Sequence, residues 1–216
     1  MEIIDFSRQH TVLNQYVAEL RDRELQKDQL RFRHNVARIG QMMAWEISKR
    51  LEYKTINVKT QLGTATIDVP SEPLVLATIL RAGLPLHEGF LNVFDRAQNA
   101  FVSAYRKYID EQHFNVHIEY MASPRIDGKT LILTDTMLAT GTSMELAYQA
   151  MLTKGHPAKV HIASVIAAKP AIELVKRVFP ENTTVWCGAI DDILNEHSYI
   201  VPGLGDAGDL IYGEKE

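Results

Sequence analysis

From Pro73 onward, short runs rich in β-branched residues alternate with stretches of helical character. This alternation is typical of a parallel sheet whose strands are joined by crossover helices. The pattern predicts strands at residues 74–80, 100–105, 116–121, 130–135, 160–167 and 184–190, and helices at residues 85–97, 143–154 and 171–178. We therefore expect an α/β fold in which a mostly parallel, twisted sheet is flanked by helices.

The two ends of the chain do not show this alternation of strand-like and helix-like stretches. Residues 11–51 are predicted to be mostly helical, because apolar residues from Phe32 to Leu51 recur at helical spacing. Residues 53–69 alternate around Leu62 and Gly63, which predicts a β-hairpin. Residues 195–213 are rich in glycine and fit no regular element.

Composition excludes several classes of protein. The 216 residues include 46% hydrophobic residues, which supply a sizeable core. The formal net charge of −4 argues against a general nucleic-acid binder. The single cysteine, Cys187, lies in an apolar run and is expected to be a packed core thiol. Residues 1–6 do not resemble a signal peptide, and no run of 18 apolar residues occurs, so we expect a cytoplasmic protein with no membrane partner.

One strand ends in a carboxylate that is followed by a loop of small residues. Residues 131–134 are followed by Asp135, and the loop from Ala139 to Ser143 precedes a predicted helix. Small residues let backbone N–H groups close on an anion, and the helix N-terminus adds a positive dipole end. A carboxylate just before a phosphate site suits a ribosyl diol, so the expected ligand is a phosphorylated sugar. The alternative is an ordinary strand-to-helix turn with Ser143 as the N-cap.

Three further patches follow predicted strands or the end of the core. Arg81, Ala82 and Gly83 follow the first predicted strand, and Tyr105, Arg106 and Lys107 precede a polar stretch at 110–115 that is a candidate flap. Residues 195–213 are suited to presenting backbone groups to a flat heterocycle. Ligands of open parallel sheets bind beyond the carboxyl ends of strands, so these patches are expected to form one site. Taken singly, the cations are equally explained as solvated surface residues.

These patches resemble one family in order and in detail. The Ala-Thr-Gly-x-Ser core at 139–143 resembles the 5-phosphoribosyl 1-diphosphate (PRPP) loop of type I phosphoribosyltransferases. Residues 195–209 resemble the uracil-binding ending of the uracil phosphoribosyltransferase family, usually N-E-x-G-Y-I-x-P-G-L-G-D-A-G-D. The resemblance implies one phosphoribosyltransferase domain over 1–216. In that domain, 1–72 form N-terminal helices and a hairpin, 73–190 the PRPP-binding core, and 191–216 a uracil-binding hood.

The resemblance also implies roles for particular residues. Residues 139–143 would hold the 5-phosphate and Asp135 the ribose hydroxyls, while Ile200 and Gly205 would present backbone groups to uracil. The implied catalytic residues are Arg81, Arg106, Asp135 and Asp206. The implied PRPP-binding residues are Arg81, Ala82, Gly83, Arg106, Asp135, Ala139, Thr140, Gly141, Thr142 and Ser143. The implied uracil-binding residues are Tyr199, Ile200, Gly205, Asp206 and Ala207.

The chain departs from the family pattern at several positions. Thr136 stands where proline is usual and Thr142 where glycine is usual, so phosphate affinity is the property most affected. Ser198 replaces a glycine, and Leu210 replaces a basic residue. Residues 85–88 also differ from the small and apolar residues expected there.

The implied reaction joins uracil N1 to C1 of PRPP, giving uridine 5′-monophosphate (UMP) and diphosphate in pyrimidine salvage. The resemblance implies Mg²⁺ as the cofactor, held by PRPP and water without direct protein ligands, and a homodimer. No strong nucleophile is required, and His197 is expected to be structural. Two alternatives stay open. One is a non-catalytic, nucleotide-sensing or RNA-binding regulator that uses the basic residues at 21–38, and the other is an enzyme for a purine or orotate.

Overall fold

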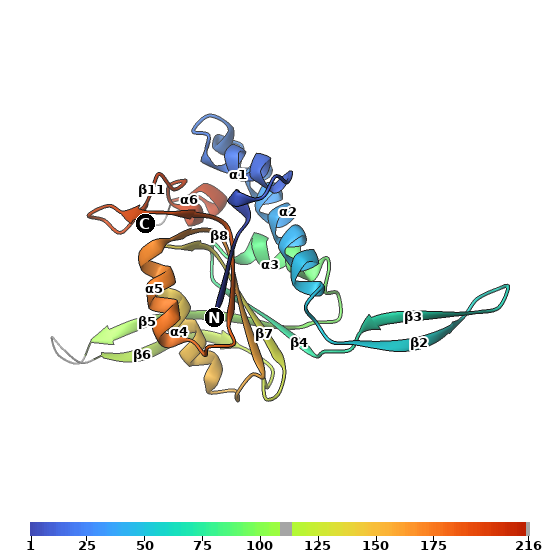
Figure 1. Cartoon of the computed structure of the whole chain (residues 1–216). Helices are drawn as coiled ribbons and strands as arrows, with labels where there is room; N and C mark the ends of the chain where they lie inside the picture. The colour runs from blue at the N-terminus through green and yellow to red at the C-terminus, as the bar shows by residue number, and fades with distance from the viewer. Residues whose placement is uncertain (109–113, 215–216) are drawn as a thin grey trace.

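The computed structural model describes residues 1–108 and 114–214, with the backbone alone for residues 104–108 and 114–118. Its centre is a seven-stranded sheet in the order β1-β9-β8-β7-β4-β5-β6 (Figure 1). All neighbours in this sheet are parallel except β5 and β6, which are antiparallel. The strands are β1 (Glu2–Asp5), β4 (Leu74–Ile79), β5 (Gln98–Tyr108), β6 (Phe114–Ala122), β7 (Thr130–Leu138), β8 (Lys159–Ala168) and β9 (Thr184–Asp191).

Helices cover both faces of the sheet (Figure 1). One face packs against α4 (Thr142–Leu152) and α5 (Lys169–Val178), and the other against α1 (Leu13–Arg21), α2 (Gln29–Ser48) and α3 (Leu84–Leu91). The buried side chains of β7 alternate between two core clusters, with Leu131 and Leu133 facing α4 and Ile132 facing α2 and α3. This burial on both faces explains why the strand is apolar throughout its first half.

The structure confirms the predicted fold class and most of its elements. Each of the six predicted strands and three predicted helices has a counterpart, although α3 ends at Leu91 rather than near residue 97. Cys187 is fully buried, and burial raises the pKa of its thiol. The predicted hairpin is β2 (Tyr53–Lys59) paired with β3 (Thr64–Pro70). It projects away from the sheet (Figure 1).

Two predictions about the chain ends were wrong or incomplete. Residues 2–5 were assigned no element, yet they form β1, which pairs with β9 at the edge of the sheet. Residues 195–213 were expected to lack regular structure. They instead contain β11 (Ile200–Val201), which pairs with β10 (Ile193–Leu194), and α6 (Ala207–Tyr212), whose first turn is capped when Asp206 accepts from the Asp209 N–H. Short polar-capped elements of this kind leave little periodicity to detect.

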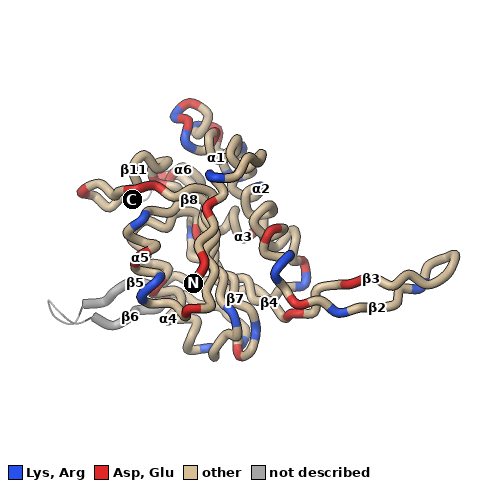
Figure 2. The backbone as a smooth tube through the Cα atoms, in the orientation of Figure 1, with Lys and Arg blue, Asp and Glu red and all other residues tan. Residues whose placement is uncertain are grey.

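No helix in the described part of the chain is long and apolar enough to cross a membrane. Lys and Arg residues are interspersed with Asp and Glu along the backbone (Figure 2). The polar surface is therefore mixed in sign.

Candidate active site

A cavity of about 260 Å³ lies beyond the carboxyl ends of β4 and β7. Three segments that are far apart in the sequence line it: the loop after β4, the loop after β7, and the C-terminal segment from Ser198 to Gly208. Its lining residues are Ile79, Leu80, Arg81, Ala82, Asp135, Met137, Ala139, Ser143, Ser198, Tyr199, Ile200, Gly205, Asp206, Ala207 and Gly208. All five predicted uracil-binding residues and five of the predicted PRPP-binding residues are among them.

Asp135 supplies a buried carboxyl group to this cavity. Its side chain is 9% exposed. Burial raises the pKa of this carboxyl to about 7, although the N–H groups of Met137 and Thr136 donate to it and act in the opposite direction. A carboxyl group in this position accepts hydrogen bonds from a diol when it is ionised. A strongly shifted pKa inside a cavity is a common feature of functional sites.

The loop before α4 has the geometry of an anion site. Gly141 has a φ of +85°, a left-handed conformation that favours glycine, and it caps the N-terminus of α4. Thr142, where glycine is usual, is the first residue of the helix, so threonine is accommodated without left-handed backbone. Its N–H donates to Thr140 Oγ1 at 3.3 Å. No Ser143 side-chain cap is formed, so the alternative of a simple N-capped turn is not the observed arrangement.

The loop after β4 and the loop at 139–143 line the same cavity. Thr136, where proline is usual, is buried and its hydroxyl donates to the carbonyl of Ala82 at 2.6 Å. This hydrogen bond ties the end of β7 to the Arg81 loop. Arg81 itself lies 3.6 Å from Asp209 of α6, measured from Nη2 to Oδ1, and 5.9 Å from the ring centroid of Tyr212. The cation is thus oriented by the C-terminal helix.

The C-terminal segment reaches the cavity as an ordered turn. The Asn195 side chain accepts from the N–H groups of His197 and Tyr199 at 3.0 and 2.9 Å. Ser198, where glycine is usual, has a φ of +63°, which explains the family's preference for glycine there. Ile200 and Leu204 are each 4% exposed and anchor the segment in the core.

Some predicted residues lie elsewhere. Gly83, Thr140, Gly141 and Thr142 belong to the two loops but do not line the cavity, and the Arg106 side chain and the candidate flap at 110–115 fall outside the described side chains. His197 is exposed and lies 3.5 Å from the Glu196 carboxylate. Sequence reasoning missed Asp209 and Tyr212 as partners of Arg81. Their spacing of three residues on one helix was the available signal.

All Lys and Arg residues at 21–38 except Arg23 have a side-chain contact within the molecule. Arg31 forms an ion pair with Glu19 at 2.9 Å, and Lys27 forms one with Glu24 at 2.6 Å. Arg21 pairs with Asp191, Arg33 donates to the Ile211 carbonyl, and Arg38 donates to Asn35. These contacts neutralise or occupy the cations that an RNA-binding face would require, which argues against that alternative.

Comparisons with known proteins agree with this geometry. The family model described as uracil phosphoribosyltransferase matches residues 7–214. The uracil phosphoribosyltransferase of Porphyromonas gingivalis is 59% identical over 215 residues, covering 100% of both chains. The solved structure of the AQ2163 protein from Aquifex aeolicus has a TM-score of 0.84 and 30% identity, and covers 98% of each chain. The orotate phosphoribosyltransferase of Mycobacterium tuberculosis has a TM-score of 0.51 at 12% identity and covers 85% of this chain and 91% of its own, a likeness of fold alone.

The parallel sheet, with its cavity beyond the ends of β4 and β7, is therefore that of a phosphoribosyltransferase, the class that the family model and the full-length relative name. The family match spans nearly the whole chain, including the C-terminal segment that lines the cavity. The chain belongs to the uracil phosphoribosyltransferase family.

Proposed function

We propose that this cavity transfers the phosphoribosyl group of PRPP to N1 of uracil, releasing diphosphate and forming UMP. The observation that carries the proposal is that one cavity joins Asp135, Arg81 and the backbone of the C-terminal segment. A phosphate site, a ribose site and a base site must lie side by side for this reaction. Family membership supports the same substrates.

In this proposal the loop at 139–143 holds the 5-phosphate. The backbone N–H groups at the N-terminus of α4 and the hydroxyls of Thr140, Thr142 and Ser143 are the available donors. Because the helix dipole and the N–H groups point the same way, the site binds an anion without a lysine or arginine.

Asp135 accepts from the ribose hydroxyls, and Arg81 and Arg106 meet the diphosphate. Arg81 is held by Asp209 and Tyr212, so its charge is in place before substrate arrives. Ala82 lines the cavity and leaves room for the diphosphate to approach the backbone. The positions of Asp135, Arg81 and Ala82 around the cavity support their roles, and the role of Arg106 rests on the family resemblance.

Uracil lies against the backbone of Ile200 and Gly205, between Tyr199 and Ala207. Uracil presents an acceptor, a donor and an acceptor along O2, N3–H and O4. A backbone carbonyl flanked by N–H groups complements that order. Asp206 keeps one carboxylate oxygen on the Asp209 N–H as a helix cap, and the other is available on the sugar side.

The chemistry is displacement at the anomeric carbon through an oxocarbenium-like transition state. The chain orients two substrates, which contributes about 7 to 11 kcal/mol, and stabilises the charge of the departing diphosphate. No covalent nucleophile is needed. The cavity has two carboxyl groups, Asp135 and Asp206, which would accept hydrogen bonds from water on an Mg²⁺ ion that PRPP and water hold without direct protein ligands. When bound, Mg²⁺ neutralises part of the diphosphate charge.

The test is diphosphate release and nucleotide formation by purified protein with PRPP, Mg²⁺ and a panel of free bases. We expect UMP from uracil and no nucleotide from adenine, guanine or orotate. Absence of UMP from a protein that still binds PRPP would refute the proposal. In the same assay, Arg106→Ala is expected to lower kcat more than it raises KM for uracil, because its charge meets the diphosphate as it leaves.

We also propose that the chain forms a homodimer through the hairpin β2–β3. This hairpin projects from the sheet (Figure 1). Leu62, between its two strands, is fully exposed, and Val58 and Ile67 are 38% and 48% exposed. Apolar side chains on an isolated arm are stabilised only when another surface covers them. Sedimentation analysis of the protein and of a variant lacking residues 56–67 tests this assignment, and a monomeric wild type would contradict it.

A further inference from the structure

An ion pair between Arg21 and Asp191 holds one turn of the C-terminal segment. It binds both the backbone N–H and the backbone carbonyl of Gly203 in that turn. The Gly203 N–H donates to Asp191 Oδ2 at 2.9 Å, and the Gly203 carbonyl accepts from Arg21 Nη1 at 3.1 Å. Arg21 also donates to both Asp191 oxygens, at 2.9 and 2.8 Å. We call these three residues the Arg21–Asp191 clamp.

The clamp is built from regions far apart in the sequence. Arg21 is the last residue of α1, and Asp191 is the last residue of β9. Their side chains are 23% and 9% exposed. A bidentate guanidinium–carboxylate pair at this depth fixes both partners in direction as well as distance, and hydrogen bonds to charged groups are the stronger class. The clamp is therefore a rigid support for the peptide that it grips.

The gripped peptide lies between the two groups that we assign to the base. Gly203 is three residues after Ile200 and two before Gly205. It has a φ of +56°, and a Cβ there would collide with the Ile200 carbonyl oxygen. The turn is thus closed tightly upon Ile200. A shift of Gly203 moves the backbone of both neighbours, because so few bonds separate them.

We propose that Arg21 and Asp191 are positioning residues for base recognition, which act by fixing the backbone of Ile200 and Gly205 through Gly203. The proposal rests on the proposed function, in which these backbone groups bind uracil. Backbone donors and acceptors have no rotamers with which to adapt. A displacement of about 1 Å is therefore enough to lower kcat/KM for uracil by as much as about 10²-fold.

The clamp acts on one end of the cavity only. Among the described residues, no hydrogen bond or ion pair joins Arg21 or Asp191 to the loops at 81–83 and 139–143. Loss of the clamp is expected to change the KM for uracil and leave the KM for PRPP nearly unchanged. A general loss of stability would change both.

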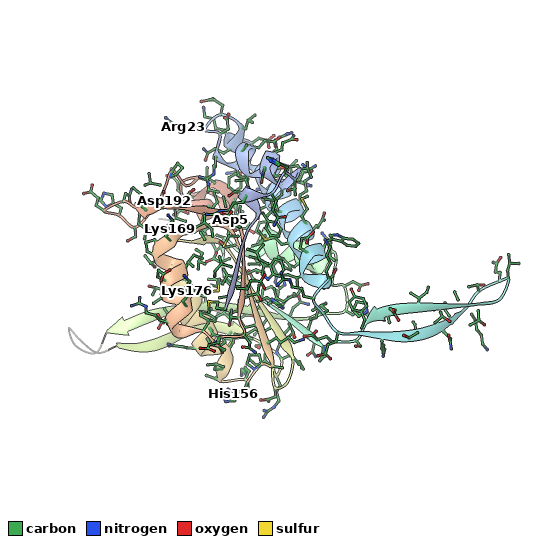
Figure 3. The ribbon with its side chains drawn as sticks, viewed as in Figure 1. Asp5, Arg23, His156, Lys169, Lys176 and Asp192 are labelled. Atoms are coloured by element: carbon green, nitrogen blue, oxygen red, sulfur yellow. The ribbon has the colours of Figure 1, made fainter. Side chains whose placement is uncertain are left out.

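The chain offers a matched control at the next residue. Asp192 pairs with Lys169 at 2.6 Å, and both side chains are largely exposed, at 74% and 65% (Figure 3). Asp192→Asn therefore makes the same chemical change one residue away, without touching Gly203. We expect Asp191→Asn to raise the KM for uracil at least about tenfold and to reduce the preference for uracil over cytosine. Asp192→Asn should match wild type in both.

Two further variants and a second readout complete the test. Arg21→Lys keeps the charge and should retain more uracil affinity than Arg21→Gln. The double variant Arg21→Gln with Asp191→Asn should raise the KM for uracil little more than either single substitution does, because both remove the same ion pair. Hydrogen exchange of the peptide spanning 199–206 should quicken in Asp191→Asn but not in Asp192→Asn.

The outcomes separate the two proposals. A wild-type protein that forms no UMP refutes the proposed function. A wild-type protein that forms UMP while Asp191→Asn matches Asp192→Asn in uracil KM and in exchange overturns the clamp. Equal rises in the KM for uracil and for PRPP in Asp191→Asn also overturn it, because they indicate general destabilisation.

Discussion

The two ends of the cavity are built in opposite ways. The phosphate loop is continuous with β7 and α4, and its shape follows from one left-handed glycine and a helix N-terminus. The C-terminal segment contains a two-residue strand, β11, and a six-residue helix, α6, and its turns are held by hydrogen bonds to the side chains of Arg21, Asp191 and Asn195. In the proposed function, phosphate binding is therefore a local property of the sequence. The proposed base recognition instead depends on a hydrogen bond between residues 182 positions apart.

The largest effect that this comparison predicts is base selectivity. In a backbone site that suits uracil, the unprotonated N3 of cytosine meets a carbonyl acceptor and its 4-amino group meets an N–H donor. These mismatches leave buried polar groups without a hydrogen bond. We expect kcat/KM for uracil to exceed that for cytosine by about 10⁴ or more. Steady-state kinetics with both bases measure this ratio. Comparable values would show that the C-terminal segment does not recognise the base through fixed backbone groups.

Asp135→Asn tests whether the buried carboxyl group contributes to kcat/KM while it lowers the free energy of unfolding near neutral pH. We expect kcat/KM to fall at least about tenfold, because an amide accepts from ribose hydroxyls more weakly than a carboxylate. The pKa of Asp135 is raised to about 7, so the native state binds a proton that the unfolded chain has released. The associated stability is present below about pH 4 and is lost as pH rises through about 7.

The amide introduced by Asp135→Asn does not titrate, so the variant should gain free energy of unfolding relative to wild type between about pH 4 and pH 8, by at most about 4 kcal/mol. Urea denaturation of both proteins at about pH 5 and about pH 8 measures the change. A difference between the two proteins that is the same at both pH values would show that Asp135 is ionised throughout.

Thr136→Val sharpens the comparison at the phosphate end. The substitution conserves shape but leaves the Ala82 carbonyl without its donor, so we expect the free energy of unfolding to fall by about 1 to 3 kcal/mol. The KM for PRPP should rise while the KM for uracil stays close to wild type. Thr136→Ser keeps the hydroxyl and serves as the control. Unchanged PRPP kinetics in Thr136→Val would separate this hydrogen bond from substrate binding.

The smallest effect is expected for Ser198→Gly. Glycine relieves the left-handed strain at this position, but it also gains conformational freedom in the unfolded chain. The two contributions oppose each other, so thermal denaturation should give a change within about 1 kcal/mol. A large loss of stability would mean that the Ser198 side chain makes a contact that matters more than its backbone.

The contrast between the two ends also explains what the sequence could predict. The strands of the core and the loop after Asp135 were predictable, because apolar runs and small residues leave a local signal. β1 was missed because four residues carry too little periodicity, and its pairing with Thr184–Cys187 is set by distant sequence. The Arg21–Asp191 clamp was invisible for the same reason. Arg21 lies inside the stretch predicted to be helical and Asp191 just after a predicted strand, and nothing in the sequence indicates that the two side chains meet.

The position of β1 has a consequence for synthesis on the ribosome. The strand is made first, but its partner β9 begins at residue 184, so the edge of the sheet stays open until most of the chain has been translated. Arg21 likewise waits for Asp191 and Gly203. A nascent chain that already contains Asp135 and the loop at 139–143 still lacks the partners of β1 and of Arg21. Closure of this sheet edge and formation of the Arg21–Asp191 clamp are therefore expected to follow the folding of the central strands.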